Sequence, residues 1–248
     1  ITEAVKAAPT GYDLVMGQKD NLVIGPWLYK NLPWDPTRDL VAVAHVAYTP
    51  VVIATSANSK FKTLADVIQA ARNAPGKVSY GSAGNGNITH LGAYMILQDK
   101  GLTAVHAPYK GSAPALTDLV AGQTQFTTDT INSALPFIKE KRLKALAVTS
   151  LKRTSVLPDV PTLNETIMPG FEVGAWQGLL VPAKTSPEII KRLNTEVVKA
   201  LASADVRAKL AVQGAEPLGS TSAEYGNYIK SELDRWNRVV KQTGASLD

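Results

Sequence analysis

The sequence predicts an α/β fold, because short runs rich in β-branched and aromatic residues alternate with amphipathic segments at helical spacing. From about residue 52 to 150 the order strand, loop, helix recurs, which is typical of units built around a mostly parallel sheet flanked by helices. The composition, 45% hydrophobic and 19% charged, is that of a globular protein and excludes intrinsic disorder as the main state.

The individual elements follow from local pattern. Predicted strands cover residues 12–16, 41–47, 51–55, 77–80, 102–106, 125–128, 143–149 and 171–181. Predicted helices begin at about residues 63, 88, 112, 132, 186 and 221, and residues 1–8 have the pattern of the last turns of another. Capping boxes at 63–66 and 221–224 mark two of these starts, and Ser186 followed by Pro187 marks a third.

Composition also argues against several classes of function. The 26 basic residues exceed the 21 acidic ones, but they are scattered, and the 6% of aromatic residues do not interleave with them, so no nucleic-acid platform is expected. The chain has no cysteine and three histidines without metal-ligand spacing, so no metal and no cofactor are expected. No apolar run approaches the ~18–20 residues that span a bilayer.

The predicted chain path suggests two lobes. Prolines at 158, 161 and 169 interrupt regular structure, and the strand over 171–181 is expected to leave the lobe formed before it. We therefore expect lobe 1 to contain residues 1–52 and 175–248, and lobe 2 residues 53–174.

Six short motifs then resemble one family. In chain order they are AAPTGYDL at 7–14, LYKNLPWDP at 28–36, YGSAGNG at 80–86, HAPYKG at 106–111, LPDVPT at 157–162 and WQG at 176–178. Together they resemble the solute-binding proteins of tripartite tricarboxylate transporters, the TctC or Bug family. Each motif is short, but their shared order over nearly the whole chain makes the resemblance specific.

The resemblance implies a two-lobed, type II periplasmic-binding-protein fold without enzymatic activity. Such a protein would work in the periplasm, as a monomer, closing over a small carboxylate and presenting it to the membrane subunits of a transporter. The family normally begins with a strand–loop–helix unit of roughly fifty residues and a signal peptide. Neither precedes Ile1 in this sequence, so we expect the natural mature protein to carry about fifty more residues there.

A glycine-rich loop at 81–87 is the first candidate ligand site. Glycines let the backbone approach an anion, Ser82 and Asn87 add donors, and a helix begins directly after the loop. The alternative is an ordinary strand–helix turn. The resemblance favours ligand binding by Ser82, Ala83, Gly84, Gly86 and Asn87, while the glycine spacing excludes a dinucleotide fingerprint.

Other candidates lie at a second helix start and at strand ends. Tyr109, Lys110 and Gly111 precede the helix at 112, although Lys110 is equally explained as a solvated cation. Asp129 is either a simple N-cap or a ligand-site residue that orients a water or a backbone donor, or pairs with a ligand amino group. Two more sites complete the predicted set: a possible cleft wall at Trp176, and Gly17 with Gln18, where the loop departs from the family pattern.

Two alternative functions stay open at this point. A sensor that feeds a signalling partner would differ only in that partner. An esterase built on Ser82, His90 and Asp129 is disfavoured, because no G-x-S-x-G elbow surrounds the serine.

Overall fold

The computed structural model describes residues 1–247, which form two compact units. Unit 1 contains Ile1–Tyr48 and the chain from Ala175 onward, and unit 2 contains Thr49–Gly174. The corresponding boundaries expected from the sequence follow residues 52 and 174. Each unit is described by itself below.

Unit 2 has a five-stranded sheet in the order β4-β3-β5-β2-β6. Its strands are the second part of β2 (Leu40–Ser56), β3 (Ser79–Ser82), β4 (Val105–Pro108), β5 (Phe126–Thr130) and β6 (Leu143–Val148). β3 is parallel to both β4 and β5, whereas β2 is antiparallel to β5 on one side and to β6 on the other. Four strands therefore run in one direction, and β2 is inserted among them in the opposite direction.

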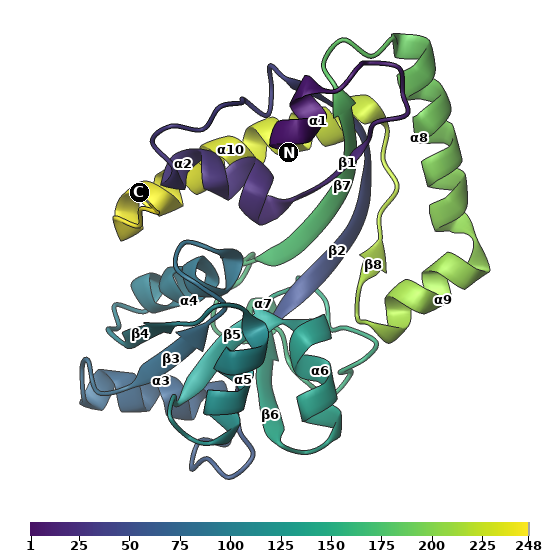
Figure 1. Ribbon diagram of the computed structural model, residues 1–248. Helices are drawn as coiled ribbons and strands as arrows, with labels where there is room; N and C mark the ends of the chain where they lie inside the picture. Colours follow the sequence, from purple (N-terminus) through teal and green to yellow (C-terminus); the bar gives the residue numbers. More distant parts are fainter. Residues whose placement is uncertain (248) are drawn as a thin grey trace. The chain divides into compact units, whose positions relative to one another are not determined.

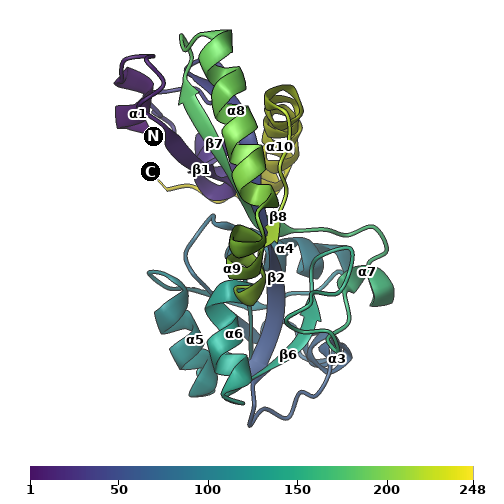
Figure 2. The ribbon, with the colours of Figure 1, turned by 90° about the vertical axis from the view of Figure 1, so that its right-hand side faces the viewer.

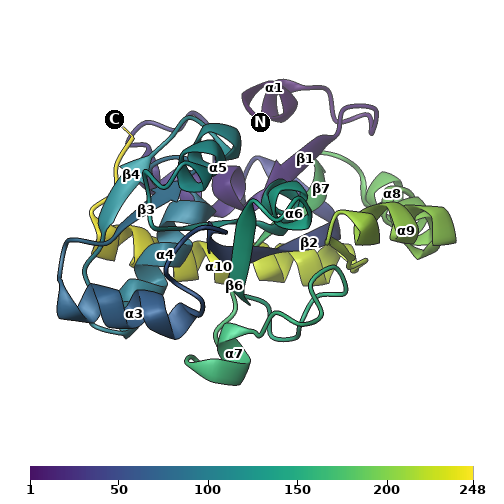
Figure 3. The ribbon, with the colours of Figure 1, turned by 90° about the horizontal axis from the view of Figure 1, so that it is seen from below.

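Helices cover both faces of the unit 2 sheet. They are α3 (Leu64–Asn73), α4 (Ile88–Asp99), α5 (Ser112–Val120), α6 (Ile131–Lys139) and α7 (Leu163–Thr166). Figures 2 and 3 show α5 and α6 on one side of the sheet and α3 on the other. The side chains agree with this arrangement, since Ile53 packs with α3 and α4 while its neighbour Val52 packs with α5 and α6.

Unit 1 contains the first part of β2 and the strands β1 (Val15–Gln18), β7 (Gly174–Pro182) and β8 (Glu216–Pro217). β1 is antiparallel to β7, and β8 is antiparallel to β2. The helices are α1 (Thr2–Lys6), α2 (Gly25–Leu28), α8 (Pro187–Ala202), α9 (Ala204–Val212) and α10 (Ser222–Thr243), with a π-helical segment at Asp20–Ile24. Figure 1 shows β1, β7 and the first part of β2 running together, with α8 beside them. Ile190, Leu193 and Val197 of α8 pack on apolar residues of β2 and β7.

The α/β class is confirmed, with a mixed sheet flanked by helices. The expectation of a mostly parallel sheet in each lobe is wrong for unit 1, where the pairs β1–β7 and β2–β8 are antiparallel. Strand direction depends on which segments pair, and alternation of apolar residues along one strand does not report its partner.

The predicted break at Thr49 and Pro50 is also corrected, because β2 is one strand from Leu40 to Ser56. Pairs with β8 end at Tyr48, and pairs with β5 begin at Val51. Pro50 lies between these two sets of pairs, at a place where its missing N–H removes no bond to β5, β6 or β8. The short helices α2, α7 and α9 were not predicted.

Candidate functional site

The candidate site lies where three helices of unit 2 begin. β3, β4 and β5 are parallel, so their carboxyl ends share one edge of the sheet, and α4, α5 and α6 each start after one of these ends (Figure 1). A helix N-terminus carries unpaired backbone N–H groups and a partial positive charge. This edge is therefore the part of unit 2 best suited to hold an anion.

The loop after β3 is held by its own hydrogen bonds. The Asn87 side-chain oxygen caps α4 by accepting from the N–H groups of Thr89 and His90, each at 3.1 Å. The N–H of Ala83 donates to Thr89 Oγ1 at 2.8 Å, and the N–H of Gly86 donates to His90 Nδ1 at 3.1 Å. The loop is thus preorganised, and these two N–H groups already have partners inside unit 2.

Glycine is required at two positions of this loop by backbone geometry. Gly84 has φ of +151° and Gly86 has φ of +75°, both in the region that side-chain-bearing residues rarely adopt. A Cβ on Gly84 would lie 3.4 Å from the carbonyl oxygen of Tyr109, in the neighbouring loop. The chain after β3 can therefore approach the chain after β4 closely.

The loop after β4 is tied to the loop after β3. The N–H of Tyr109 donates to the Ser82 carbonyl at 3.0 Å, and the N–H of Gly111 donates to the Ala83 carbonyl at 2.9 Å. The Tyr109 hydroxyl donates to Asp118 at 2.8 Å, while the side chain of Lys110 is exposed. Both loops consequently belong to one local structure.

Asp129 lies where α5 and α6 begin. Its Oδ1 accepts from Ser112 Oγ, the first residue of α5, at 2.8 Å and from the N–H of Thr130, the N-cap of α6, at 2.7 Å. The carboxyl group is fully buried, and its Oδ2 has no hydrogen-bond partner among the described residues. Burial raises the pKa of Asp129 to about 6, although the hydrogen bonds from Ser112 and Thr130 act in the opposite direction.

The starts of α5 and α6 differ from the other helix starts. Of the helices within residues 1–247 that span eight residues or more, α3, α4, α8, α9 and α10 are capped by a side chain of their N-cap residue. α5 and α6 have no such cap: Gly111 has no side chain to offer, and the Thr130 hydroxyl contacts the Ser133 hydroxyl at 3.0 Å. Because Ser112 Oγ contacts Asp129, these two uncapped N-termini lie side by side.

The histidines of unit 2 do not form a catalytic relay. Ser82 Oγ lies 2.6 Å from His106 Nε2, and the rings of His106 and His90 stack in parallel at 3.9 Å. His90 accepts the Gly86 N–H through Nδ1, and Asp129 is engaged with Ser112 and Thr130. Burial, with a smaller contribution from His106, lowers the pKa of His90 to about 4, so this imidazole is neutral near pH 7. The trio considered for an esterase is therefore not assembled.

The three candidates from unit 1 lie on β1 and β7. Gly17 and Gln18 pair with Gly178 and Gln177. A Cβ on Gly17 would lie 2.3 Å from Leu22 Cδ1 and 2.6 Å from Leu180 Cδ1, so a side chain at this position would displace these two leucines. Trp176, predicted as a cleft wall, is fully buried, and its indole is a core side chain of unit 1.

Trp176 belongs to a buried polar cluster that the sequence analysis missed. Its indole N–H and that of Trp236 both donate to Glu232 Oε2 at 3.1 Å, and Lys19 Nζ lies 2.9 Å from the same oxygen. The side chains of Lys19 and Glu232 are 2% and 4% exposed. A signal was present, because Glu232 occupies the apolar stripe of α10 together with Ile229 and Trp236, and a carboxylate in such a position needs a buried cation.

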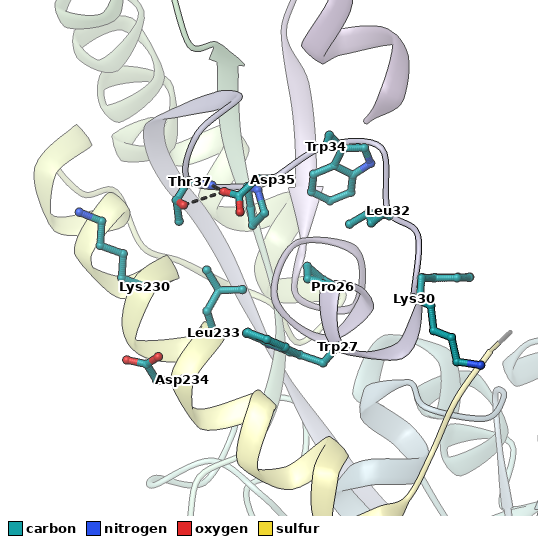
Figure 4. A pocket seen from close by; sticks show the side chains of 12 residues that line it. Pro26, Trp27, Lys30, Leu32, Trp34, Asp35, Thr37, Lys230, Leu233 and Asp234 are labelled. Carbon is teal, nitrogen blue, oxygen red and sulfur yellow. Dashed lines mark hydrogen bonds between the residues drawn. The ribbon is translucent and has the colours of Figure 1, made fainter.

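Unit 1 also has a surface pocket of about 500 Å³ between α2, the segment that follows it, and α10 (Figure 4). Trp27 of α2 lines it, and Lys230, Leu233 and Asp234 line it from α10. Trp34 lines it from the other side and is largely buried, as expected of a packing residue, whereas Trp27 is 39% exposed. The mixture of scattered charges and apolar rings forms no recognisable catalytic set.

Among residues 1–247, no cluster of three His, Cys, Asp or Glu side chains has the arrangement of a metal site. None of the helices in this part of the chain has the length and apolar character needed to cross a membrane.

Comparison with known proteins places the chain in a family. The family model for the tripartite tricarboxylate transporter family receptor, TctC, matches residues 2–245. A Pseudomonas protein named for the tcbD-tcbE intergenic region is 36% identical over 240 residues, covering 96% of this chain and 71% of that protein. BugT of Bordetella pertussis is 33% identical over 243 residues, covering 98% of this chain and 74% of BugT.

Solved structures agree with the sequence relatives. An R. palustris protein with adipate superposes with a TM-score of 0.89 at 31% identity, covering 99% of this chain and 83% of that one. MatC from Rhodopseudomonas palustris with bound malate gives 0.81 at 30% identity, with 96% and 82% covered. The chain belongs to the tripartite tricarboxylate transporter receptor family, TctC, whose members, the Bug proteins among them, are periplasmic solute-binding proteins and not enzymes.

Proposed function

We propose that this protein binds a small organic carboxylate where α4, α5 and α6 of unit 2 begin. The observation that carries the proposal is the pair of uncapped N-termini of α5 and α6, joined through Ser112 and Asp129. Uncapped N-termini combine free N–H donors with a partial positive charge, which is the requirement for anion binding without arginine. The adipate and malate in the two R. palustris structures support carboxylate as the ligand class.

The preorganised loops supply the frame of this site. Ser82, Ala83, Gly84, Gly86 and Asn87 hold the start of α4, and Tyr109, Lys110 and Gly111 lead into α5. The bonds from Tyr109 to Ser82 and from Gly111 to Ala83 fix the two loops together. Donors held in place before binding cost little conformational entropy when the ligand arrives.

Membership of a periplasmic receptor family supports a role as a monomeric periplasmic receptor that delivers its ligand to the membrane subunits of a tripartite tricarboxylate-type transporter.

A thermal-shift panel tests the ligand class. Adipate, malate, citrate and nicotinate are compared with glycerol and glucose, and ligand at 100 times its Kd adds about 2.7 kcal/mol to the free energy of unfolding. We expect at least one carboxylate to raise the Tm and neither neutral solute to do so. A rise in Tm with the neutral solutes alone would overturn the proposal.

A charge placed at an uncapped helix start tests the location. Thr130→Asp puts a carboxylate at the N-cap of α6, where it competes with an anionic ligand for the same N–H groups. Ser186→Asp is the matched control, because it adds the same charge to α8, which already has a side-chain cap. We expect Thr130→Asp to weaken carboxylate binding at least about tenfold, near 1.4 kcal/mol, and Ser186→Asp to leave it unchanged. Equal affinities would place the ligand elsewhere.

A further inference from the structure

We propose that Asp129 takes up a proton when the carboxylate ligand binds, so that the protein captures an anion together with one H⁺. This inference rests on the proposed function, since it concerns the same helix N-termini. It assigns Asp129 as a positioning residue whose charge state governs affinity, and it does not require that Asp129 touch the ligand.

An ionised Asp129 and a bound ligand carboxylate would both be stabilised by the same positive potential, that of the N-termini of α5 and α6. Asp129 accepts from Ser112 at the start of α5 and from the N–H of Thr130 at the start of α6. An ionised Asp129 therefore neutralises part of the positive potential that the two N-termini offer to an anion. A second carboxylate at this edge would be repelled by the first, and like charges brought together in a buried site raise the affinity of one of them for a proton.

The two oxygens of Asp129 are in different situations. Oδ1 has two donors, at 2.8 and 2.7 Å, whereas Oδ2 is buried and has no partner within the described chain. No donor stabilises negative charge on Oδ2, so this oxygen is the position at which a proton is held most readily. Protonation there leaves both hydrogen bonds to Oδ1 intact.

The pKa of Asp129 supports the same conclusion. Burial raises the pKa of Asp129 to about 6 even without a ligand, so that its proton is within easy reach near neutral pH. Five elements pack against β5. Their titratable side chains are His45 and Tyr48 of β2, Tyr80 of β3, Asp118 of α5, Lys139 of α6, and His90, Tyr94 and Asp99 of α4. None of them contributes to the shift, whose causes are burial and the bonds from Ser112 and Thr130.

The two neighbouring imidazoles, those of His90 and His106, carry little charge between about pH 7 and 8. The pKa of His90 is lowered to about 4 by burial and by His106, and burial also lowers the pKa of His106. Both rings are therefore mainly neutral between about pH 7 and 8, where Asp129 without ligand is mainly ionised.

The test measures the affinity of adipate and malate at about pH 6 and about pH 8, together with the protons exchanged on binding. The apparent Kd is expected to rise on the order of 50-fold between the two pH values, as follows from a group of pKa about 6 that must be protonated in the complex. Calorimetry near pH 8 in buffers of different ionisation enthalpy should show an uptake of about one proton per ligand. Neither measurement requires a variant, so both remain valid if a substitution at Asp129 prevents folding.

Asp129→Asn then isolates the residue. An amide keeps an oxygen that accepts from Ser112 and Thr130 and is neutral at every pH, so the Kd should be nearly equal at the two pH values, with no proton uptake. Near pH 8 the variant should bind more tightly than the unaltered protein. Asp159→Asn, which removes one exposed carboxylate in the segment between β6 and α7, should retain the original pH profile.

Three results would overturn the inference. Binding whose affinity does not depend on pH, without proton exchange, would exclude it and leave the proposed function standing. Malate affinity that rises with pH and is lost in Asp129→Asn would show that an ionised Asp129 accepts a bond from the malate hydroxyl. Failure of every carboxylate in the thermal-shift panel would remove the proposed function, and this inference with it.

Discussion

Each unit contains a buried carboxylate, and the two carboxylates differ in the donors and cations that surround them. In unit 1, Glu232 Oε2 is contacted by Lys19 and by the indoles of Trp176 and Trp236. In unit 2, one oxygen of Asp129 has two donors, while the other has none among the described residues and no cation contributes to its environment.

The pKa values follow this difference. Burial raises the pKa of Glu232, but the charge of Lys19 and the hydrogen bonds from Lys19, Trp176 and Trp236 outweigh it and lower the pKa to about 2. Burial dominates at Asp129 and raises the pKa to about 6. A buried carboxylate with a full set of partners has a structural role, whereas one with an unsatisfied oxygen beside two uncapped helices can respond to a ligand.

Breaking the paired carboxylate should have the largest effect. Lys19→Met removes the buried cation from Glu232 and leaves only the partly exposed Arg235, whose Nη1 lies 3.4 Å from Oε1. This is expected to reduce the free energy of unfolding by about 3–5 kcal/mol in urea denaturation. Lys19→Met combined with Glu232→Leu should recover much of that loss, because both fully buried charges are then gone and Arg235, 34% exposed, can be solvated. A single variant as stable as the original protein would show that the pair is not needed.

The free energy of unfolding should depend on pH because of Asp129, the carboxylate without a cation. The folded state holds the Asp129 proton more tightly than the unfolded chain does, with pKa values of about 6 and 3.8. Stability from this group is therefore fully present below about pH 4 and is lost as the pH rises through 6, by about 3 kcal/mol in total.

Asp129→Asn provides the reference for that measurement. The difference in the free energy of unfolding between the variant and the original protein should change by that amount between about pH 4 and 7, in favour of the variant at the higher pH. A difference that stays constant across this range would show that folding does not shift the pKa of Asp129.

The affinity for carboxylate tests the proposed site directly. Gly84→Val places a branched side chain at φ of +151° close to the Tyr109 carbonyl, and should weaken carboxylate binding by on the order of 1–3 kcal/mol. Lys152→Ala, on an exposed residue after β6, should change it by less than about 0.5 kcal/mol. Calorimetry that finds equal losses in the two variants would contradict the assigned site.

The smallest effect is expected from an exposed counterpart of the Lys19–Glu232 pair. Lys209 lies 2.8 Å from Asp205 on α9, at nearly the same separation, but the two side chains are 73% and 72% exposed. Lys209→Met should change the free energy of unfolding by less than about 0.5 kcal/mol, because water screens the pair. A loss comparable to that of Lys19→Met would show that separation, and not burial, sets the strength of these pairs.

Much of the local structure could be predicted because its causes are local. The capping boxes at Thr63 and Thr221 and the N-cap at Ser186 are all observed. Strand limits were less accurate: β3 and β4 each end two residues beyond the predicted end, at Ser82 and Pro108. The ends of these two strands are set by their pairing with each other, and a partner so distant in sequence cannot be inferred from either strand alone.

Local sequence patterns were sufficient to predict the α/β class, the starts of the longer helices other than α9, the glycine loop and, through six collinear motifs, the family. Tertiary structure decided which polar groups are satisfied. Asp129 could be proposed as an N-cap or a ligand-site residue, but only the fold shows that Ser112 and Thr130 share one of its oxygens and leave the other unpaired. Lys19 and Glu232 likewise carry no sign in the sequence that they meet. The physical reason is the same in both cases: desolvation and pairing depend on the positions of atoms from distant segments, whereas propensity and capping depend on neighbours along the chain.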